Sequence, residues 1–289
     1  MILYFSGASS KLVTQFMIEQ NCSRLFSFYI DKKLIESKIC NDVFLDCGAW
    51  TAFTQGITIN VNEYCDYLKV HKDCYRVAAS LDVIPKGDVV KSAEDSYNNF
   101  KYLRSKLGRE YPIIPTYHRG ESLDSLRKLL TYSDEFGDLD YIGIGAIANN
   151  VNKNMRTEFL DSVFSVIHKE NPNIKVHLFG LTDLSLLNIY PIYSADSTTW
   201  VMAGAMGEIL TDFGRVKVSN QNFHVKSVNG YSKIKLDKLS SYVQNLGFNL
   251  QDLQNSAEYR KMFNIAFMKN KVESMNCVPK NFSMKKRLF

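Results

Sequence analysis

The sequence predicts a (β/α)8 barrel of the TIM type, followed by a basic, mainly helical extension at the C-terminus. Apolar, strand-like runs alternate with helical stretches eight times within about 210 of the 289 residues. The runs are almost continuously apolar, as expected for parallel strands that are buried on both faces. The alternation ends near residue 212, so we expect a barrel over 1–211 and an extension over 212–289 that packs on it. A doubly wound open sheet is the rival arrangement, and the count of eight favours the barrel.

The expected strands are short runs rich in aliphatic, β-branched and aromatic residues. In chain order they cover 2–8, 25–30, 43–48, 76–84, 112–118, 141–147, 175–181 and 192–197. The helical stretches that follow them are 10–20, a short basic segment after residue 30, 62–72, about 88–107, 122–130, about 154–169, one that opens at Thr182 or Asp183, and one from 198. Several of these stretches are preceded by Ser, Thr or Asp, which are favourable N-cap residues.

The extension has a different pattern. The segment EILTDFGRVKV is typical of a β-hairpin with its turn at 212–214, and helices are expected over 233–247 and 251–268. Apolar residues of the first helix form a rough stripe, which we interpret as a surface that packs against the barrel. The stripe consists of Ile234, Leu236, Leu239, Val243 and Leu246.

Basic residues are concentrated in the same extension. Residues 212–289 hold 14 Lys and Arg against five Asp and Glu, a net charge of +9, whereas residues 1–211 carry a net charge of −4. This asymmetry indicates a polyanionic partner, most simply nucleic acid, although a solvated Lys-rich tail explains it equally well. The candidate phosphate contacts are Lys285, Lys286, Arg287, Lys233, Lys235 and Lys238.

Several other classes of protein are not indicated. No run of about 18 apolar residues occurs, and the N-terminal MILYFSGASSK is typical of a first strand and not of a signal peptide. The six cysteines form no C-x-x-C pair, which suggests free thiols in a reducing cytoplasm. The paired Cys and His spacings of a structural zinc site are missing, so we expect no metal and no other cofactor.

Three aspartates carry the functional prediction. Asp46, Asp82 and Asp196 each stand where a strand-like run gives way to a loop. A carboxylate is costly to desolvate unless it is paired or hydrogen-bonded, and catalytic groups of barrels lie at the carboxyl ends of the strands. Four further positions follow other strands, namely His118, Gly145, Ala146 and Gly180. Any one of them is as well explained by a turn or a cap, but together we expect them to share one pocket.

Glycines and aromatic residues near the strand ends add to this prediction. Gly48, Gly143, Gly145 and Gly180 suggest either bends at the barrel corners or close approach of the backbone to a flat ligand. Trp50 and Tyr117 are candidates for stacking on a base, or for filling the barrel rim.

The segments that contain these residues resemble motifs of the tRNA-guanine transglycosylase family. LDCGAWTAF is similar to the family's D-S-G-[GA]-[FY] motif, and SLDVIP to its second aspartate motif. YIGIGAIA resembles its G-G-L-A segment, and HLFGLTDLSLL resembles its L-M-G-V-G segment with the helix that follows. YSADSTTW matches the family's final aspartate at the eighth strand, and all five segments occur in the family's order and spacing across residues 40–210.

The resemblance implies an exchange of bases. Asp196 would attack the anomeric carbon of a guanosine nucleotide and expel guanine, after which a 7-deazaguanine base displaces the enzyme. Asp46 is implied to be the neighbouring acid/base or a carboxylate on the ribose side, and Asp82 to accept hydrogen bonds from the amino and ring N–H groups of the base. Gly145, Ala146 and Gly180 are implied to line the base site, with His118 where the family usually has a glutamine. The covalent route is that of retaining glycosidases.

Two departures from the tRNA enzymes point to one branch of the family. Those enzymes carry a C-x-C-x-x-C zinc site after the barrel, whereas this shorter chain has only Cys277 there. The chain is therefore more similar to phage enzymes that insert 7-deazaguanines into DNA, the DNA deazaguanine transglycosylases. DNA and a free 7-deazaguanine base are the expected partners. The expected location is the cytoplasm, which is that of the host cell if a phage encodes the protein. The alternatives are the same exchange on tRNA, a barrel N-glycosidase that does not replace the base, and a catalytically idle nucleic-acid-binding barrel.

Overall fold

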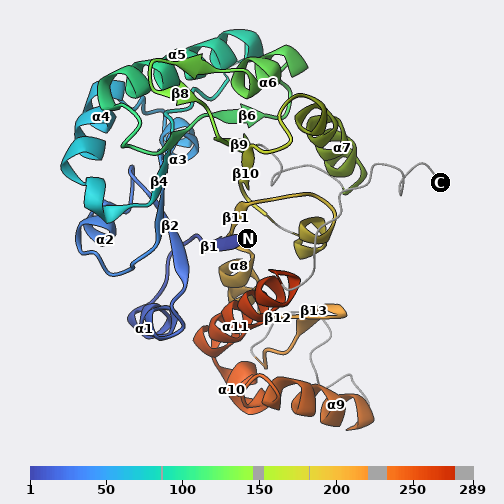
Figure 1. Cartoon of the computed structure of the whole chain (residues 1–289). Coiled ribbons are helices and arrows are strands. Elements are labelled where there is room, and N and C mark those ends of the chain that lie inside the picture. The colour runs from blue at the N-terminus through green and yellow to red at the C-terminus, as the bar shows by residue number, and fades with distance from the viewer. Residues whose placement is uncertain (86, 146–152, 182, 221–232, 277–289) are drawn as a thin grey trace. The chain divides into compact units, whose positions relative to one another are not determined.

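The computed structural model describes residues 1–85, 87–145, 153–181, 183–220 and 233–276 (Figure 1). The chain forms two compact units. The first contains Met1–Ser6 and Ser23–Asp196, and the second contains Gly7–Cys22 and the described residues from Ser197 onwards. This division differs from the boundary after residue 211, because the helices that follow the first and last barrel strands pack with the C-terminal helices.

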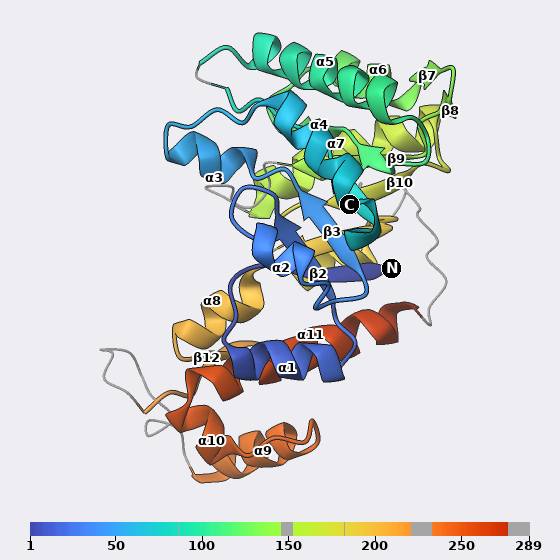
Figure 2. The same ribbon diagram turned by 90° about the vertical axis from the view of Figure 1, so that its left-hand side faces the viewer.

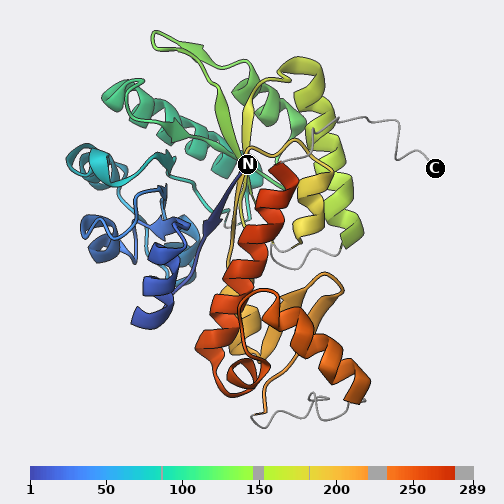
Figure 3. The ribbon, with the colours of Figure 1, turned by 60° about the horizontal axis from the view of Figure 1, so that its bottom comes forward.

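The first unit is built on a sheet of parallel strands that runs in the order β5-β4-β3-β2-β1-β11-β10-β9-β6. The strands are β1 (Ile2–Phe5), β2 (Ser23–Ser27), β3 (Val43–Asp46), β4 (Val77–Ala79), β5 (Ile113–Ile114), β6 (Thr116–His118), β9 (Tyr141–Gly145), β10 (Lys175–Leu178) and β11 (Ser194–Ser197). The two ends of this order, β5 and β6, are separated along the chain by Pro115 alone. The sheet is therefore a nearly closed barrel, as Figure 3 shows from below.

Proline accounts for the interruption between β5 and β6. Pro115 has no N–H to give to a strand ladder, although its carbonyl accepts the N–H of Gly143 at 2.8 Å. On one side Ile113 pairs with Ala78 of β4, and on the other Thr116 pairs with Gly143 of β9. The predicted barrel-like parallel sheet is thus confirmed in outline, and the rival open sheet is wrong.

Helices surround the sheet within the first unit (Figure 3). They are α2 (Lys32–Glu36), α3 (Ala49–Thr54), α4 (Val61–Val70), η1 (Lys72–Cys74), α5 (Val89–Leu107), α6 (Leu123–Leu130), α7 (Lys153–Glu170) and η2 (Leu184–Asn188). Side chains of Asn60, Asp88, Ser122 and Asp183 cap the N-termini of four of them. The segment opened by Asp183 is a short 3₁₀ helix and not the longer helix that the pattern predicts.

Helix α3 and a small hairpin of this unit were not predicted. Helix α3 begins directly after Gly48, and a small antiparallel hairpin joins β7 (Ser133–Asp134) to β8 (Gly137–Asp138). The hairpin is held by Arg104 of α5, whose Nε lies 3.1 Å from the carboxylate of Asp134.

The interior of the barrel is filled by side chains. A buried cluster joins Tyr4, Phe44, Val77, Ala79 and Ile114, which come from the four strands β1, β3, β4 and β5. The rings of Tyr4 and Phe44 meet edge to face with their centroids 5.4 Å apart. The core is therefore a solid layer, and a ligand has access to the strand ends rather than to the middle of the barrel.

The second unit is mainly helical. It contains α1 (Lys11–Glu19), α8 (Thr199–Ala205), β12 (Glu208–Thr211), β13 (Gly214–Lys217), α9 (Lys233–Gln244), α10 (Leu250–Asn255) and α11 (Ala257–Asn276). The predicted hairpin is confirmed, because Thr211 pairs with Gly214. The helix predicted over 251–268 is instead two helices, which break at Ser256, and the second continues to Asn276.

Helix α11 organises this unit. It packs on α1, on α8 and on β12, and Figure 2 shows α1 and α11 side by side. The buried Arg260 donates to the carbonyls of Gly204 and Leu253, and Asn264 bridges Trp200 to Leu210. Buried donors and acceptors that are paired in this way fix one packing of the helices. From the predicted stripe, Leu239 and Val243 are buried within this unit.

Candidate functional site

The candidate residues of the first unit gather at the carboxyl ends of the parallel strands. Asp46, His118 and Gly145 are the last residues of β3, β6 and β9, and Asp196 is the third residue of β11. Asp82 and Gly180 follow β4 and β10 by a few residues. Because the strands are parallel neighbours around one barrel, their carboxyl ends meet at one rim. The contacts described below show which side chains meet there.

Asp196 is buried, and its carboxylate is held at both oxygens. Oδ2 accepts a hydrogen bond from the hydroxyl of Ser6 at 2.9 Å, and Oδ1 accepts one from the backbone N–H of Gly180 at 2.8 Å. Gly180 has a left-handed backbone conformation with φ 69°, which glycine adopts without strain. These donors orient the carboxylate without adding a positive charge.

Asp46 is the carboxylate with a strongly altered environment. Burial, together with the charges of Asp82 and Asp196, raises the pKa of Asp46 to about 7, against the opposing hydrogen bond from the N–H of Gly48. The three aspartates are therefore close enough to interact electrostatically. A carboxyl with a pKa near 7 can give and take a proton under physiological conditions, which is the property of a general acid/base.

Gly48 is required next to this carboxylate. Its backbone has φ 78°, and a Cβ would lie 2.5 Å from both the hydroxyl of Ser27 and the Cβ of Tyr29. The close packing holds the N–H of Gly48 against Asp46 at 2.9 Å. The neighbouring Cys47 is wholly buried, and burial raises the pKa of its thiol, so this cysteine is protonated and unreactive.

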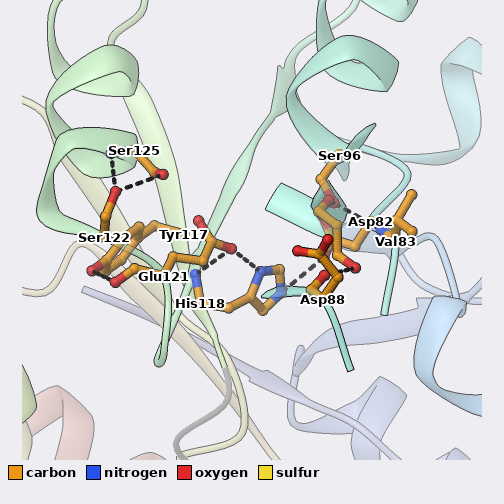
Figure 4. A network of polar contacts seen from close by, with 10 residues as sticks. Asp82, Val83, Asp88, Ser96, Tyr117, His118, Glu121, Ser122 and Ser125 are labelled. Atoms are coloured by element: carbon orange, nitrogen blue, oxygen red, sulfur yellow. Dashed lines mark hydrogen bonds and ion pairs between the residues drawn. The ribbon is translucent and has the colours of Figure 1, made fainter. Parts of the chain in front are cut away.

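Asp82 forms an ion pair with His118, which in turn contacts Glu121 (Figure 4). The Nε2 atom of His118 lies 3.3 Å from Asp82, and Nδ1 lies 3.0 Å from Glu121. Burial lowers the pKa of His118, but the two carboxylates outweigh this effect and raise it to about 10. His118 is therefore an imidazolium at neutral pH, with each nitrogen donating to one carboxylate.

The loop that carries Asp82 is fixed by helix α5. The N–H of Val83 donates to the hydroxyl of Ser96 at 2.8 Å (Figure 4). The amide of Asn99 donates to the carbonyl of Leu81 at 3.0 Å. On the other side, the carboxylate of Glu121 also accepts the backbone N–H of His118 at 3.2 Å. Both partners of the Asp82–His118 pair are thus preorganised by neighbouring backbone contacts.

Gly145 has a steric reason to be glycine. A Cβ at this position would lie 2.7 Å from Cδ2 of the His118 ring and 3.1 Å from its Nε2. The glycine therefore makes room for the imidazolium, a role that the sequence alone did not indicate. Ala146, its predicted companion in base binding, lies outside the described residues.

The two aromatic candidates, Tyr117 and Trp50, differ in their exposure to solvent. Tyr117 is buried, stacks on Phe159 with the ring centroids 6.0 Å apart, and donates its hydroxyl to the carbonyl of Glu121. Alternate residues of a strand point to opposite faces, so in β6 the side chains of Thr116 and His118 face the inside of the barrel and that of Tyr117 faces outwards. The interpretation of Tyr117 as a base-stacking residue is therefore wrong. Trp50 of α3 is 55% exposed.

The basic candidates lie in the part of the chain that the structure covers least. Lys238 is exposed on α9, and Lys233 and Lys235 belong to the first turn of that helix, where side chains are not described. Lys285, Lys286 and Arg287 lie outside the described residues. The role of all six residues in binding phosphate stays a prediction.

No protein-family model matches this chain. A search of curated proteins likewise finds no significant relative. Within the described residues, no group of three or more His, Cys, Asp and Glu side chains is arranged to hold a metal ion. Of the helices that the structure describes, none has the length and apolar character needed to cross a bilayer. Inference about function therefore rests on the geometry of the strand ends.

Three residues of the site escaped the sequence analysis, namely Ser6, Glu121 and His177. Ser6 directly follows β1, and Glu121 follows His118 by three residues, so their proximity to a strand end was a usable signal. His177 lies within a strand among apolar residues and is wholly buried. Nothing in its sequence context separates it from a structural core residue.

Proposed function

We propose that this protein is a guanine transglycosylase that exchanges a guanine in DNA for a 7-deazaguanine base through a covalent aspartyl–nucleotide intermediate. The observation that carries the proposal is that two carboxyl groups at one rim have unlike environments. Asp196 has both oxygens held by uncharged donors, and Asp46, which is close enough to feel its charge, has a pKa of about 7. Two titratable groups with different environments are the arrangement that divides the roles of nucleophile and acid/base.

The first chemical step opens the nucleotide. Asp196 attacks C1′ of the target deoxyguanosine, and the bond from C1′ to N9 of guanine breaks. The electron pair of that bond passes to the base, which receives a proton from Asp46 and leaves as neutral guanine. An ester between Asp196 and C1′ remains, and Asp46 is left ionised.

The second step reverses the first with a new base. The incoming 7-deazaguanine gives its N9 proton to Asp46, and N9 attacks C1′. The bond between C1′ and Asp196 breaks, and its electron pair returns to the carboxylate. A single acid/base thus serves both steps, which requires a pKa close to the working pH.

Recognition of the base is assigned to Asp82 and His118, with backbone from Gly145, Ala146 and Gly180. The edge of guanine presents two N–H donors beside the O6 acceptor. The carboxylate of Asp82 supplies acceptors for these N–H groups, and the imidazolium of His118, 3.3 Å away, holds that carboxylate in place. Asp82 therefore complements the N–H groups of guanine and of 7-deazaguanines, which share this edge.

DNA is proposed as the polymer substrate because of the basic extension. Residues 212–289 carry a net charge of +9, and phosphate neutralisation by such a segment favours polyanion binding. The target base must leave the duplex, or be single-stranded, to reach the strand ends. We expect the basic segment 280–287 and the lysines of α9 to contact the phosphate backbone of the DNA.

Exchange of a labelled base tests the proposal. The purified protein is incubated with DNA oligonucleotides, in single and double strands, and with ¹⁵N-labelled guanine, and the nucleosides are measured by mass spectrometry. We expect labelled deoxyguanosine to appear at constant guanine content, and the Asp196→Asn variant to lose this activity by several orders of magnitude. Abasic sites without labelled product identify an N-glycosidase instead, and exchange in tRNA alone identifies a tRNA enzyme.

A further inference from the structure

His177 is a buried histidine for which the proposed chemistry has no use so far. It lies on β10 inside the barrel and is 0% exposed. Its ring centroid lies 4.3 Å from those of both Phe44 and Phe179. The Nε2 atom is buried and has no hydrogen-bond partner among the residues that the structure describes. An unpaired buried polar group destabilises the folded state, so its presence calls for an explanation.

The two ring nitrogens of His177 face different polar groups. Nδ1 lies 2.6 Å from the hydroxyl of Ser194, and that hydroxyl is in turn hydrogen-bonded to the hydroxyl of Tyr141. On the other side, Nε2 lies 3.5 Å from Oδ1 of Asp196. The line of contacts from Tyr141 through Ser194 and His177 ends at the carboxylate to which we assign the nucleophilic role.

Electrostatics selects one direction of hydrogen bonding along this line. Burial lowers the pKa of His177, although Asp196 acts in the opposite direction, so the ring is neutral and carries one N–H. A lone pair on Nε2 would face the oxygen of Asp196 and repel it. The proton therefore belongs on Nε2, while Nδ1 accepts from Ser194 and Ser194 accepts from Tyr141.

We propose that His177 is a positioning residue that donates its Nε2–H to Oδ1 of Asp196 when the nucleotide is bound, and so leaves Oδ2 to form the bond to C1′. This inference rests on the proposed function. Catalytic hydrogen bonds that are long in a free enzyme shorten in the substrate complex, which accounts for the present 3.5 Å. Oδ1 is also held by the rigid backbone N–H of Gly180, whereas Oδ2 faces the rotatable hydroxyl of Ser6.

A neutral donor suits both steps of the exchange. It orients the carboxylate without the charge neutralisation that an imidazolium would bring, so the nucleophile keeps its negative charge. In the ester, Oδ1 becomes a carbonyl oxygen and still accepts from His177 and Gly180. When the bond from Oδ2 to C1′ breaks, the same donors meet the charge that returns to the carboxylate.

Variants at the two ends of the ring test this role. His177→Phe keeps an aromatic ring among Phe44 and Phe179 but removes the donor, whereas His177→Gln retains an amide N–H. We expect the rate of covalent adduct formation to fall about 10- to 100-fold in His177→Phe, with partial recovery in His177→Gln and unchanged guanine affinity. Ser194→Ala is expected to fall between the wild type and His177→Phe. The matched control is Tyr190→Phe, which removes another buried donor, the one to Asp161, and should leave the rate unchanged.

A spectroscopic readout separates this inference from the proposed function. The ¹⁵N shifts of His177 in the free protein report its tautomer, and we expect Nε2 protonated and Nδ1 unprotonated. A proton on Nδ1 overturns the inference, as does a His177→Phe variant with the wild-type rate of adduct formation. If the wild type forms no adduct, the proposed function fails, and the tautomer still decides whether Asp196 receives a hydrogen bond from this ring.

Discussion

Replacing Asp46 by asparagine is expected to stabilise the protein while it removes activity. The folded protein raises the pKa of this carboxyl from 3.8 to about 7, so the folded state binds a proton more tightly than the unfolded state. The stability of the wild type must then fall as the pH rises from about 4 to about 7, because above that range the folded state holds an unfavourable charge. Asparagine has the same shape and no charge to hold.

The magnitude follows from the two pKa values. Their difference corresponds to about 4 kcal/mol, and because the carboxyl is partly exposed, solvent screening reduces the expected effect to about 2–4 kcal/mol. We compare the free energy of unfolding of Asp46→Asn with that of the wild type at each pH. The difference between the two proteins should be larger at pH 7.5 than at pH 4 by this amount, in favour of the variant. Urea unfolding at a series of pH values measures it.

A control of opposite sign sharpens this test. Burial acts to raise the pKa of Asp134, but the hydrogen bonds from Arg104, the N–H of Phe136 and Tyr132 together outweigh it and hold the pKa below its usual value. The contribution of Asp134 to stability is therefore present above pH 4 and disappears as the pH falls through its lowered pKa. Asp134→Asn should lose about 2 kcal/mol at pH 7. A difference between Asp46→Asn and the wild type that does not change with pH would refute the reasoning about the site.

Three other predictions concern the base site and the extension. Asp82→Ala should weaken guanine binding by about 2–4 kcal/mol, as measured by calorimetry. The same variant should lower the pKa of His118 from about 10 in an NMR titration, and an unchanged pKa would contradict the ion pair. Gly145→Ala should displace the His118 ring and destabilise the protein by about 1–3 kcal/mol, whereas wild-type stability would show that the ring has room. Replacing Lys285, Lys286 and Arg287 by glutamate should weaken DNA binding and make the affinity less dependent on salt. On duplex DNA, the logarithm of the affinity falls with the logarithm of the salt concentration by about 0.9 for each phosphate contact. An unaltered slope would mean that this segment is a solvated tail.

The rim of the barrel could be predicted from the sequence because strand ends are local features. Asp46, His118 and Asp196 each follow a short apolar run, and parallel strands bring such ends to one side. The turn between β12 and β13 was equally local, since Gly214 marks it. These predictions needed the order of the elements and no knowledge of individual contacts.

The contacts that give the site its chemistry could not be predicted in the same way. The bond from Ser6 to Asp196 joins residues that are 190 positions apart, and it depends on β1 and β11 being neighbours. The ring of His177 points into the barrel, whereas that of Tyr117 points away from it towards α7. Which face a residue occupies depends on strand register, and a shift of one residue reverses it.

The central claim is that Asp196 becomes covalently bonded to the nucleotide, and trapping the intermediate tests it most directly. The protein is incubated with guanine-containing DNA without an incoming base, denatured, digested with nuclease and trypsin, and analysed by tandem mass spectrometry. Cleavage after Lys175 and Arg215 places Asp196 in a peptide separate from Asp46 and Asp82. We expect a nucleotide mass on this peptide, with fragments that locate it at Asp196. An adduct on Asp46, or base exchange that proceeds without any adduct, would contradict the claim.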